Sequence, residues 1–251
     1  MGNLGVYIYN IVHYKSKLMI KTRIIGHRGA AGLALENTIP SFEKAVEVGA
    51  QTIEFDVHTT KDGQFVVCHN EHLKQVSTSD KSLKDLTYEE LKQIPLHNGA
   101  HVPLLREVLD LAKANGLAVI VEIKTVNNTK EFCNLLDEYK KLDVTVACFK
   151  YKTLAIVRRL RPDYKLYLGE QHRPIAALQE VKALKGQGVD LHYMLINPLT
   201  YWLAQRWKMD IMLYTINNRF LGNVITMLYP KVVICTDRPD YFIRTKSGKA
   251  V

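Results

Sequence analysis

A predicted β-hairpin brings two carboxylates and an imidazole to one place. Two strand-like runs, TIEFDV and QFVVCH, are joined by TTKDGQ, whose Asp62-Gly63 pair is typical of a two-residue type I′ turn. With that pair at the centre of the turn, Asp56 faces His69 across the hairpin. Side chains alternate along a strand, so Glu54 shares the face of Asp56. These groups could do acid–base or cation-binding chemistry, and an ordinary surface salt bridge is the alternative.

Further polar residues follow other apolar runs. The run RIIGHRGA places His27 and Arg28 just before a Gly-rich loop that carries Glu36. In VIVEIK, Glu122 and Lys124 alternate with apolar residues, so both should point to one side of a strand. Carboxylate oxygens without thiolates suit a hard cation such as Mg²⁺ or Ca²⁺. We therefore expect a third carboxylate to join the hairpin pair around one ion, with a structural Glu–Lys ion pair as the alternative.

The elements that position these residues alternate regularly along the chain. Most predicted strands are near-continuous apolar runs, as in parallel strands buried on both faces. Eight strands and eight helices predict an α/β fold, a (β/α)₈ TIM barrel with a β-hairpin and a short insertion, 72–103, after strand two. The predicted strands are 23–27, 52–57, 118–123, 144–148, 165–169, 190–195, 211–216 and 232–236, with a hairpin arm at 65–69. The predicted helices lie near 39–48, 104–114, 130–141, 152–161, 174–186, 198–208, 219–228 and 238–245.

Barrels of this kind carry their chemistry at the C-terminal ends of the strands. Separate segments of this chain place polar side chains there, which is hard to explain by chance. The residues at or near predicted strand ends are His27, Glu54, Asp56, Glu122, Lys124 and Asn217.

Composition limits the classes of partner. The 251 residues, 47% hydrophobic, are enough for one large domain. The net charge of +9 is spread along the chain without a nucleic-acid motif, so we expect an anionic small-molecule substrate and no nucleic acid. The four cysteines show no paired spacing, which argues against a zinc site or a disulfide framework. A reducing compartment, the cytoplasm, is therefore the expected location. No pattern indicates an oligomeric state.

We expect one barrel domain, residues 23–251, behind an N-terminal extension, residues 1–22. The apolar run LGVYIYNIV in the extension is too short to span a bilayer, and the basic residues that follow it are on the wrong side for a secretory signal. A loosely attached extension is therefore predicted. Weak membrane-surface contact is the alternative.

Motifs in their order along the chain resemble the glycerophosphodiester phosphodiesterase family. HRG is followed by LENTIPSFEKAVEVGA and IEFDVHTTKDGQFVVCHN, and then by VEIK, LYTIN and TDRPD. The resemblance covers nearly the whole chain from residue 23 onward. It implies a TIM barrel that cleaves glycerophosphodiesters, such as glycerophosphocholine and glycerophosphoethanolamine, to an alcohol and sn-glycerol 3-phosphate. The implied cofactor is a divalent cation, Mg²⁺ or Ca²⁺.

The resemblance also implies a role for each motif position. The implied nucleophile is the glycerol 2-hydroxyl of the substrate, which gives a cyclic phosphate that water then opens. One histidine acts as general acid and the other as general base, and the motifs do not say which is which. The implied roles are catalysis for His27 and His69, phosphate binding for Arg28 and Lys124, and metal binding for Glu54, Asp56 and Glu122.

Some positions depart from the family pattern or lie beside it. Asn70 stands where the family usually has Asp, so it brings no charge to raise the basicity of a neighbouring imidazole. Tyr214 stands where a tryptophan is common, so packing around the glycerol should differ. We expect Glu36 to orient the loop or His27 rather than bind metal, and Asn217 to lie at the rim.

Residues without a motif role have modest predictions. Asp237 and Arg238 should cap the last helix or pair locally, and Cys68 should pack in a core. Seven histidines that match no motif, His58 among them, should be surface or core side chains.

Two other functions remain open at this point. A lysophospholipase D acting on lysophospholipids at a membrane would suit the apolar N-terminal run and the positive charge. A catalytically impaired barrel that binds phosphate esters would suit Asn70.

Overall fold

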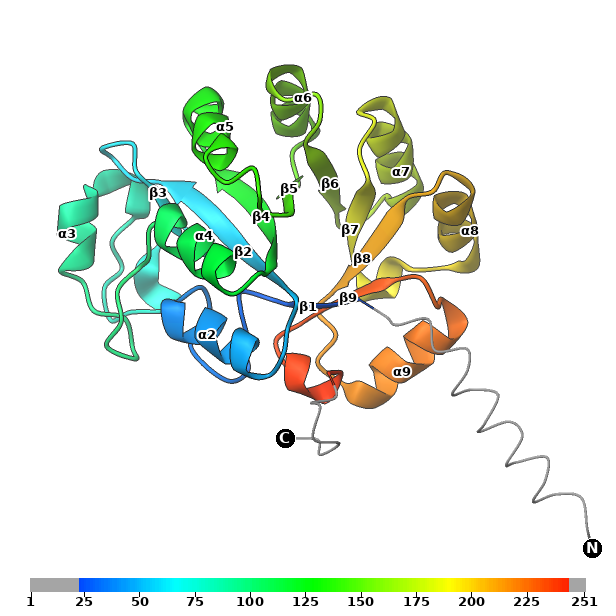
Figure 1. Ribbon diagram of the computed structural model, residues 1–251, viewed down its shortest axis with the longest axis horizontal. Coiled ribbons are helices and arrows are strands. Elements are labelled where there is room, and N and C mark those ends of the chain that lie inside the picture. Colours follow the sequence, from blue (N-terminus) through cyan, green and yellow to red (C-terminus); the bar gives the residue numbers. More distant parts are fainter. Residues whose placement is uncertain (1–22, 244–251) are drawn as a thin grey trace, which may run out of the picture.

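The computed structural model describes residues 23–243, which form a closed barrel of eight parallel strands surrounded by helices (Figure 1). Neighbouring strands follow the order β1-β9-β8-β7-β6-β5-β4-β2, and β2 pairs with β1 to close the ring. The predicted α/β class and TIM-barrel architecture are confirmed. The barrel strands are β1 (Ile24–Gly26), β2 (Thr52–Thr59), β4 (Ala118–Thr125), β5 (Val144–Cys148), β6 (Lys165–Glu170), β7 (Gly188–His192), β8 (Asp210–Tyr214) and β9 (Val233–Thr236), and β3 (Phe65–Val67) pairs antiparallel with the end of β2.

The two faces of the barrel strands serve two cores. On β2, Ile53, Phe55 and Val57 point outward into the main core between barrel and helices. The alternate residues Glu54 and Asp56 consequently point into the barrel. Apolar side chains fill the barrel interior: Ile25, Ile120, Ala147, Tyr167, Met212, Val233 and Cys235.

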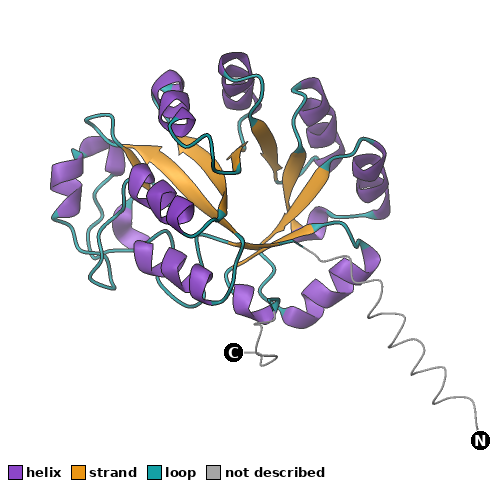
Figure 2. Cartoon of the chain, in the orientation of Figure 1, coloured by secondary structure: helices purple, strands orange, loops and turns teal. Residues whose placement is uncertain are grey.

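Helices cover the outside of the barrel (Figure 2). Thr38 caps the first of them by accepting a hydrogen bond from the Ser41 N–H, and Pro40 lies in its first turn. The helix predicted at 238–245 is wrong within the described part, where η4 (Pro239–Tyr241) is a single 3₁₀ turn closed by bonds to carbonyls three residues back. The α-helices are α2 (Ile39–Glu47), α3 (Tyr88–Lys92), α4 (Leu105–Ala114), α5 (Thr129–Asp137), α6 (Tyr151–Leu160), α7 (Pro174–Ala183), α8 (Pro198–Arg206) and α9 (Arg219–Leu228).

The predicted hairpin forms, but its register is shifted by one residue. Its loop has three residues, 61–63, rather than two, and Gly63 has a φ of 84°, as in a type I turn followed by a left-handed residue. The Cys68 N–H donates to the Asp56 carbonyl at 3.0 Å, so Cys68 lies opposite Asp56 and the predicted Asp56–His69 pairing is wrong. His69 reaches the barrel mouth from the segment that follows β3.

Residues 72–103 form the insertion predicted after the hairpin. They contain two 3₁₀ turns, η1 (Leu73–Gln75) and η2 (Leu83–Asp85), and helix α3. Their apolar side chains make a small separate core, and Cys68 packs in it as expected. The predicted extension, residues 1–22, lies outside the described residues. Within residues 23–243, none of the helices is long and apolar enough to cross a membrane.

Candidate active site

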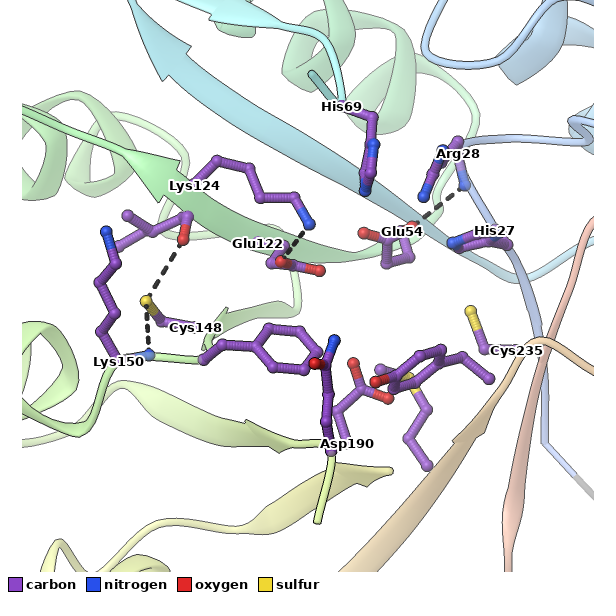
Figure 3. Close-up of a pocket in the computed structure, with 15 residues that line it drawn as sticks. His27, Arg28, Glu54, His69, Glu122, Lys124, Cys148, Lys150, Asp190 and Cys235 are labelled. Atoms are coloured by element: carbon purple, nitrogen blue, oxygen red, sulfur yellow. Dashed lines mark hydrogen bonds and ion pairs between the residues drawn. The ribbon is translucent and has the colours of Figure 1, made fainter. Parts of the chain in front are cut away.

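A cavity of about 310 Å³ opens at the C-terminal ends of the barrel strands (Figure 3). Side chains from β2, β4, β7 and β8, from the segment after β1 and from the segment after β3 contribute to its wall. The structure therefore brings together residues that are far apart in the sequence. The sequence-predicted residues that line the cavity are His27, Arg28, Glu54, His69, Glu122, Lys124 and Tyr214.

Glu54, Asp56 and Glu122 form a buried acidic cluster. One carboxylate oxygen from each lies within 4.8 Å of the others, and the residues are 3%, 1% and 8% exposed. Asp56 and Glu122 are register partners on the neighbouring strands β2 and β4. One Glu54 oxygen has no hydrogen-bond partner among residues 23–243. Buried carboxylates this close repel one another without a shared cation, so the cluster fits a divalent ion held by oxygen ligands.

Two cationic side chains border this acidic cluster. The Lys124 ammonium lies 3.0 Å from Asp56 and 2.5 Å from Glu122. The Arg28 Nε lies 3.4 Å from Asp56, and the Arg28 backbone N–H donates to Glu54 at 3.1 Å. Both side chains also line the cavity. An anion in the cavity would therefore meet positive charge next to the acidic cluster.

The three carboxyl groups differ in how readily they ionise. Burial raises the pKa of Glu54 well above its usual range, and the nearby Asp56 and Glu122 raise it further. Burial and Asp56 also raise the pKa of Glu122, to about 7, although Lys124 opposes them. For Asp56, burial is outweighed by Lys124 and Arg28, which lower the pKa. A metal ion bound there would therefore compete with protons for Glu54 and Glu122, whose pKa values are raised.

His27 is held by a carboxylate that the sequence analysis did not assign to the site. The His27 Nδ1 lies 2.6 Å from Asp237 Oδ1. Asn217 donates to the other Asp237 oxygen at 2.5 Å, and its own carbonyl accepts from the Asp237 N–H at 2.9 Å. Burial would raise the pKa of Asp237, but the bond from His27 brings it below its usual value. The buttress of Asp237 and Asn217 leaves the His27 Nε2 available to the cavity.

The expectation that Asp237 caps the last helix is therefore wrong, whereas Arg238 does pair locally, with Asp240 at 2.7 Å. A signal for Asp237 was present in the sequence. It directly follows β9, so the strand-end rule that selected the other residues indicates it as well.

His69 is held by a neutral group instead. Its Nδ1 lies 2.7 Å from Asn70 Oδ1, and the Asn70 amide in turn donates to the Gln75 side chain. Burial lowers the pKa of His69, and the charge of Asp56 opposes this effect. The position that departs from the family pattern is thus the direct partner of the second histidine.

His58 also supports His69, although it matches no motif. It is 4% exposed, its Nε2 donates to the His69 carbonyl at 3.0 Å, and its Nδ1 lies 2.6 Å from the Thr125 hydroxyl. This chain of bonds ties the segment after β3 to the end of β4. His58 is a buried side chain, as expected, but it also fixes the backbone of a candidate catalytic residue.

The loop after β1 is folded around the acidic cluster. Arg28 and Asn37 have left-handed φ values of 50° and 55°. The Glu36 carboxylate accepts two bonds from Arg28 Nη1, at 2.9 and 2.8 Å, and the Asn37 amide donates to Asp56 at 2.9 Å. Glu36 therefore orients the loop, through Arg28 rather than through His27, and it is not one of the clustered carboxylates.

A comparison with protein families agrees with this geometry. Residues 27–241 match the Glycerophosphoryl diester phosphodiesterase family. The chain belongs to this family. It is therefore an enzyme, a phosphodiesterase, and the matched segment runs from His27 past Asp237.

Relatives of this phosphodiesterase are found in bacteria and in mammals. The chain is 31% identical over 192 residues to a glycerophosphodiester phosphodiesterase of Bacillus altitudinis, covering 67% of this chain and 78% of the relative. It is 33% identical over 151 residues to a lysophospholipase D of Mus musculus, covering 54% and 48% of the two chains. A solved structure of an Oleispira antarctica phosphodiesterase, in complex with its product sn-glycerol-3-phosphate, is similar with a TM-score of 0.78 at 23% identity, covering 86% of this chain and 93% of that one. At this identity the structural likeness concerns the fold.

Residues of β7 and β8 form another part of the phosphodiesterase cavity wall. Figure 3 shows Asp190 on β7 across the cavity from Glu54 and Glu122. Tyr214 on β8 packs edge-to-face against Phe149, with ring centroids 6.0 Å apart. Asp190 is not apparent from the sequence, because a single acid in the run GVDLH matches no motif, and the strand predicted at 190–195 in fact begins at Gly188.

Proposed function

We propose that this phosphodiesterase hydrolyses glycerophosphodiesters such as glycerophosphocholine and glycerophosphoethanolamine to an alcohol and sn-glycerol 3-phosphate. One observation carries the proposal: two imidazoles, an acidic cluster and two cationic side chains share one cavity. Each of these groups can assist the cleavage of a phosphodiester. Its oxygens carry negative charge that must be offset, and its leaving alkoxide needs a proton.

The proposed metal site is the acidic cluster, Glu54, Asp56 and Glu122. A divalent cation, Mg²⁺ or Ca²⁺, held there would offset negative charge on the phosphoryl oxygens. The all-oxygen donor set supports this choice of metals over zinc or copper. Arg28 and Lys124 would contact the same phosphoryl group from the cavity wall.

The proton transfers would fall to His27 and His69. One imidazole takes the proton of the glycerol 2-hydroxyl as that oxygen bonds to phosphorus. The other donates a proton to the head-group oxygen as its bond to phosphorus breaks, so the head group leaves as an alcohol. Water then attacks the cyclic phosphate with the histidine roles reversed, which restores the 2-hydroxyl and gives sn-glycerol 3-phosphate. Each transfer is worth about 10²–10⁴ in rate.

The first test is release of sn-glycerol 3-phosphate from glycerophosphocholine. We expect activity that EDTA abolishes and that Mg²⁺ or Ca²⁺ restores. Activity unaffected by EDTA would remove the metal from the proposal. Binding of sn-glycerol 3-phosphate without any turnover would instead support the impaired barrel that Asn70 suggests.

A second candidate function, lysophospholipase D activity, has an observation of its own in favour. Three apolar side chains follow the C-terminal ends of β7 and β8, close along the chain to the cavity wall, and are strongly exposed: Met194 (74%), Leu199 (52%) and Phe220 (78%). They could meet the acyl chain of a lysophospholipid. A direct comparison of kcat/KM for glycerophosphocholine and lysophosphatidylcholine decides between the two substrates, and we expect the glycerophosphodiester to be preferred.

We also propose a cytoplasmic location. The four cysteines are free and buried, which supports a reducing compartment.

A further inference from the structure

The cavity wall formed by β7 and β8 holds two buried polar atoms with no partner. Asp190 is 5% exposed, and its Oδ1 has no hydrogen-bond partner among residues 23–243. The Tyr214 hydroxyl is likewise buried and has no well-formed hydrogen bond among residues 23–243, although the Gln171 side chain, which also lines the cavity, comes near enough to lower the pKa of Tyr214 against the larger effect of burial. Both residues line the cavity, and in Figure 3 the Asp190 carboxylate points into it.

Nothing in the fold requires a carboxylate at Asp190. A buried polar atom without a partner loses its hydration and gains no bond, so it destabilises the folded state. Asp210, at the opposite end of the neighbouring strand, shows the usual solution: it accepts from the Tyr167 hydroxyl at 2.6 Å and pairs with Arg23 at 2.6 Å. An unsatisfied acid that lines a binding cavity is therefore better explained by a ligand than by folding.

We propose that Asp190 and Tyr214 form a subsite for the terminal hydroxyl of the substrate glycerol. The subsite, which rests on the proposed function, accepts a free hydroxyl and disfavours an esterified one. The substrate hydroxyl donates to Asp190 Oδ1 and shares a hydrogen bond with the Tyr214 hydroxyl. A lysophospholipid carries an acyl ester at this position. It therefore has no hydroxyl proton to donate to Asp190, and its acyl chain would have to fit at the inner end of the cavity.

Depth in the barrel favours glycerol over the head group as the occupant. In the sheet register Asp190 pairs with Met212, and Tyr214 lies two residues further toward the mouth. Met212 belongs to the apolar core that closes the barrel interior. The inner end of the cavity, beside Asp190, therefore suits the glycerol, which is common to all glycerophosphodiesters. A quaternary ammonium also has no N–H to give the Asp190 oxygen.

The electrostatic surroundings of Asp190 support a neutral hydroxyl, rather than a cation, as its hydrogen-bond donor. Burial raises the pKa of Asp190 well above its usual value, and Glu122 raises it further. A hydroxyl can bond to this group whether or not it is ionised, because a carboxylic acid keeps a free acceptor oxygen.

The decisive substrate pair is glycerophosphocholine and the phosphocholine ester of propane-1,2-diol. The second compound keeps the 2-hydroxyl that attacks phosphorus and lacks only the terminal hydroxyl. We expect the parent enzyme to prefer glycerophosphocholine by about 10- to 100-fold in kcat/KM, since a site built for a hydroxyl discriminates against its absence. In Asp190→Leu the preference should fall to within a few-fold, and Tyr214→Phe should give part of that fall.

A matched control separates this effect from folding. Thr200 on α8 also buries a hydroxyl without a partner, but it does not line the cavity. We expect Thr200→Val and Asp190→Leu both to keep or raise the melting temperature, because each removes an unsatisfied polar atom. Only Asp190→Leu should lose the substrate preference.

Other outcomes would overturn the subsite. A parent enzyme that cleaves both esters equally has no such subsite. If Asp190→Leu keeps the preference but changes the ranking of glycerophosphocholine, glycerophosphoethanolamine and glycerophosphoglycerol, the occupant is the head group. If no substrate is turned over, the proposed function fails, and the subsite is still tested by binding. In that case sn-glycerol 3-phosphate should stabilise the parent more than propane-1,2-diol phosphate does, and equal stabilisation would overturn the proposal.

Discussion

The two histidines of the cavity are supported by chemically different surroundings. His27, beside β1, has the carboxylate of Asp237 behind its Nδ1 at 2.6 Å, and Asn217 holds that carboxylate. His69, beyond β3, has the amide oxygen of Asn70 behind its Nδ1 at 2.7 Å. Both imidazoles are oriented, but only one is backed by a negative charge.

This difference points to different proton-transfer roles. A carboxylate behind an imidazole stabilises the imidazolium that forms when the ring accepts a proton, so His27 suits the general base of the first step. The Asn70 amide oxygen also raises the pKa of His69 by accepting a hydrogen bond, but it brings no negative charge to the ring. Burial nevertheless lowers the pKa of His69, against the effect of Asp56, so its protonated form gives up a proton readily. His69 therefore suits the general acid.

The largest expected effect comes from removing each imidazole. His27→Ala and His69→Ala should each lower kcat for glycerophosphocholine by about 10²–10⁴. A p-nitrophenyl glycerophosphodiester separates the two roles, because p-nitrophenolate leaves without protonation. We expect His69→Ala to recover most of its activity on this substrate and His27→Ala to recover little. Recovery by His27→Ala alone would exchange the assignments, and equal behaviour would remove the distinction.

Removing the charge behind His27 should have the next largest effect. In Asp237→Asn the ring keeps a hydrogen-bond partner but loses the carboxylate, so kcat should fall about 10- to 100-fold, the value of one charge-assisted bond. The matched control is Asp240→Asn, since Asp240 is a carboxylate three residues away that pairs with Arg238. It should leave kcat unchanged. If Asp237→Asn is as active as the parent, the buttress has no catalytic role.

Local sequence rules predicted the barrel and the acidic cluster at its mouth. Near-continuous apolar runs predicted strands close to most of those observed, because parallel strands buried on both faces are apolar along most of their length. Glu54, Asp56 and Glu122 were found as a group because alternation within a strand fixes the side to which a side chain points.

Residues whose position depends on turn geometry or on distant contacts were harder to predict. An Asp-Gly pair suits both a two-residue and a three-residue loop, and the choice moves the register by one, which made the Asp56–His69 pairing wrong. Asp237 bonds to a histidine 210 residues away, so no local pattern reveals the contact. Asp190 stands alone in an apolar strand, and only its unsatisfied oxygen in the folded chain sets it apart.

A smaller effect should follow when His69 is given the charge that it lacks. Asn70→Asp places a carboxylate at its Nδ1 and should raise the pKa of His69, because a negative charge beside the ring favours the protonated form. The limb of the pH–kcat profile that belongs to His69 then moves to higher pH. If His69 is the general acid, the alkaline limb moves and activity rises several-fold on the alkaline side. If His69 is the base, the acidic limb moves and activity falls on the acidic side. An unchanged profile would show that this charge is idle.

The smallest effect concerns the backbone of His69, which His58 holds through its carbonyl. His58→Gln keeps a donor and should lower kcat only a few-fold with little change in KM. His58→Ala leaves the His69 carbonyl and the Thr125 hydroxyl without their His58 partner and should cost about 1–3 kcal/mol of unfolding free energy. The corresponding link on the His27 side, from the His27 N–H to the Thr236 carbonyl at 2.9 Å, is a backbone bond between paired strands and needs no such side chain.

The role of His58 can also be tested through the pH dependence of the folding stability. Burial lowers the pKa of His58 in the folded protein, although its bond to the His69 carbonyl opposes the shift. As pH falls through the unfolded value of about 6.5, the unfolded chain takes up the proton first. The stability that neutral His58 contributes is therefore present above that pH and is lost below it. Thermal unfolding between about pH 7.5 and pH 5.5 should show a steeper loss in the parent than in His58→Gln, which cannot titrate. Parallel curves would mean that His58 is solvated, and its hold on His69 would then be too weak to position the catalytic ring.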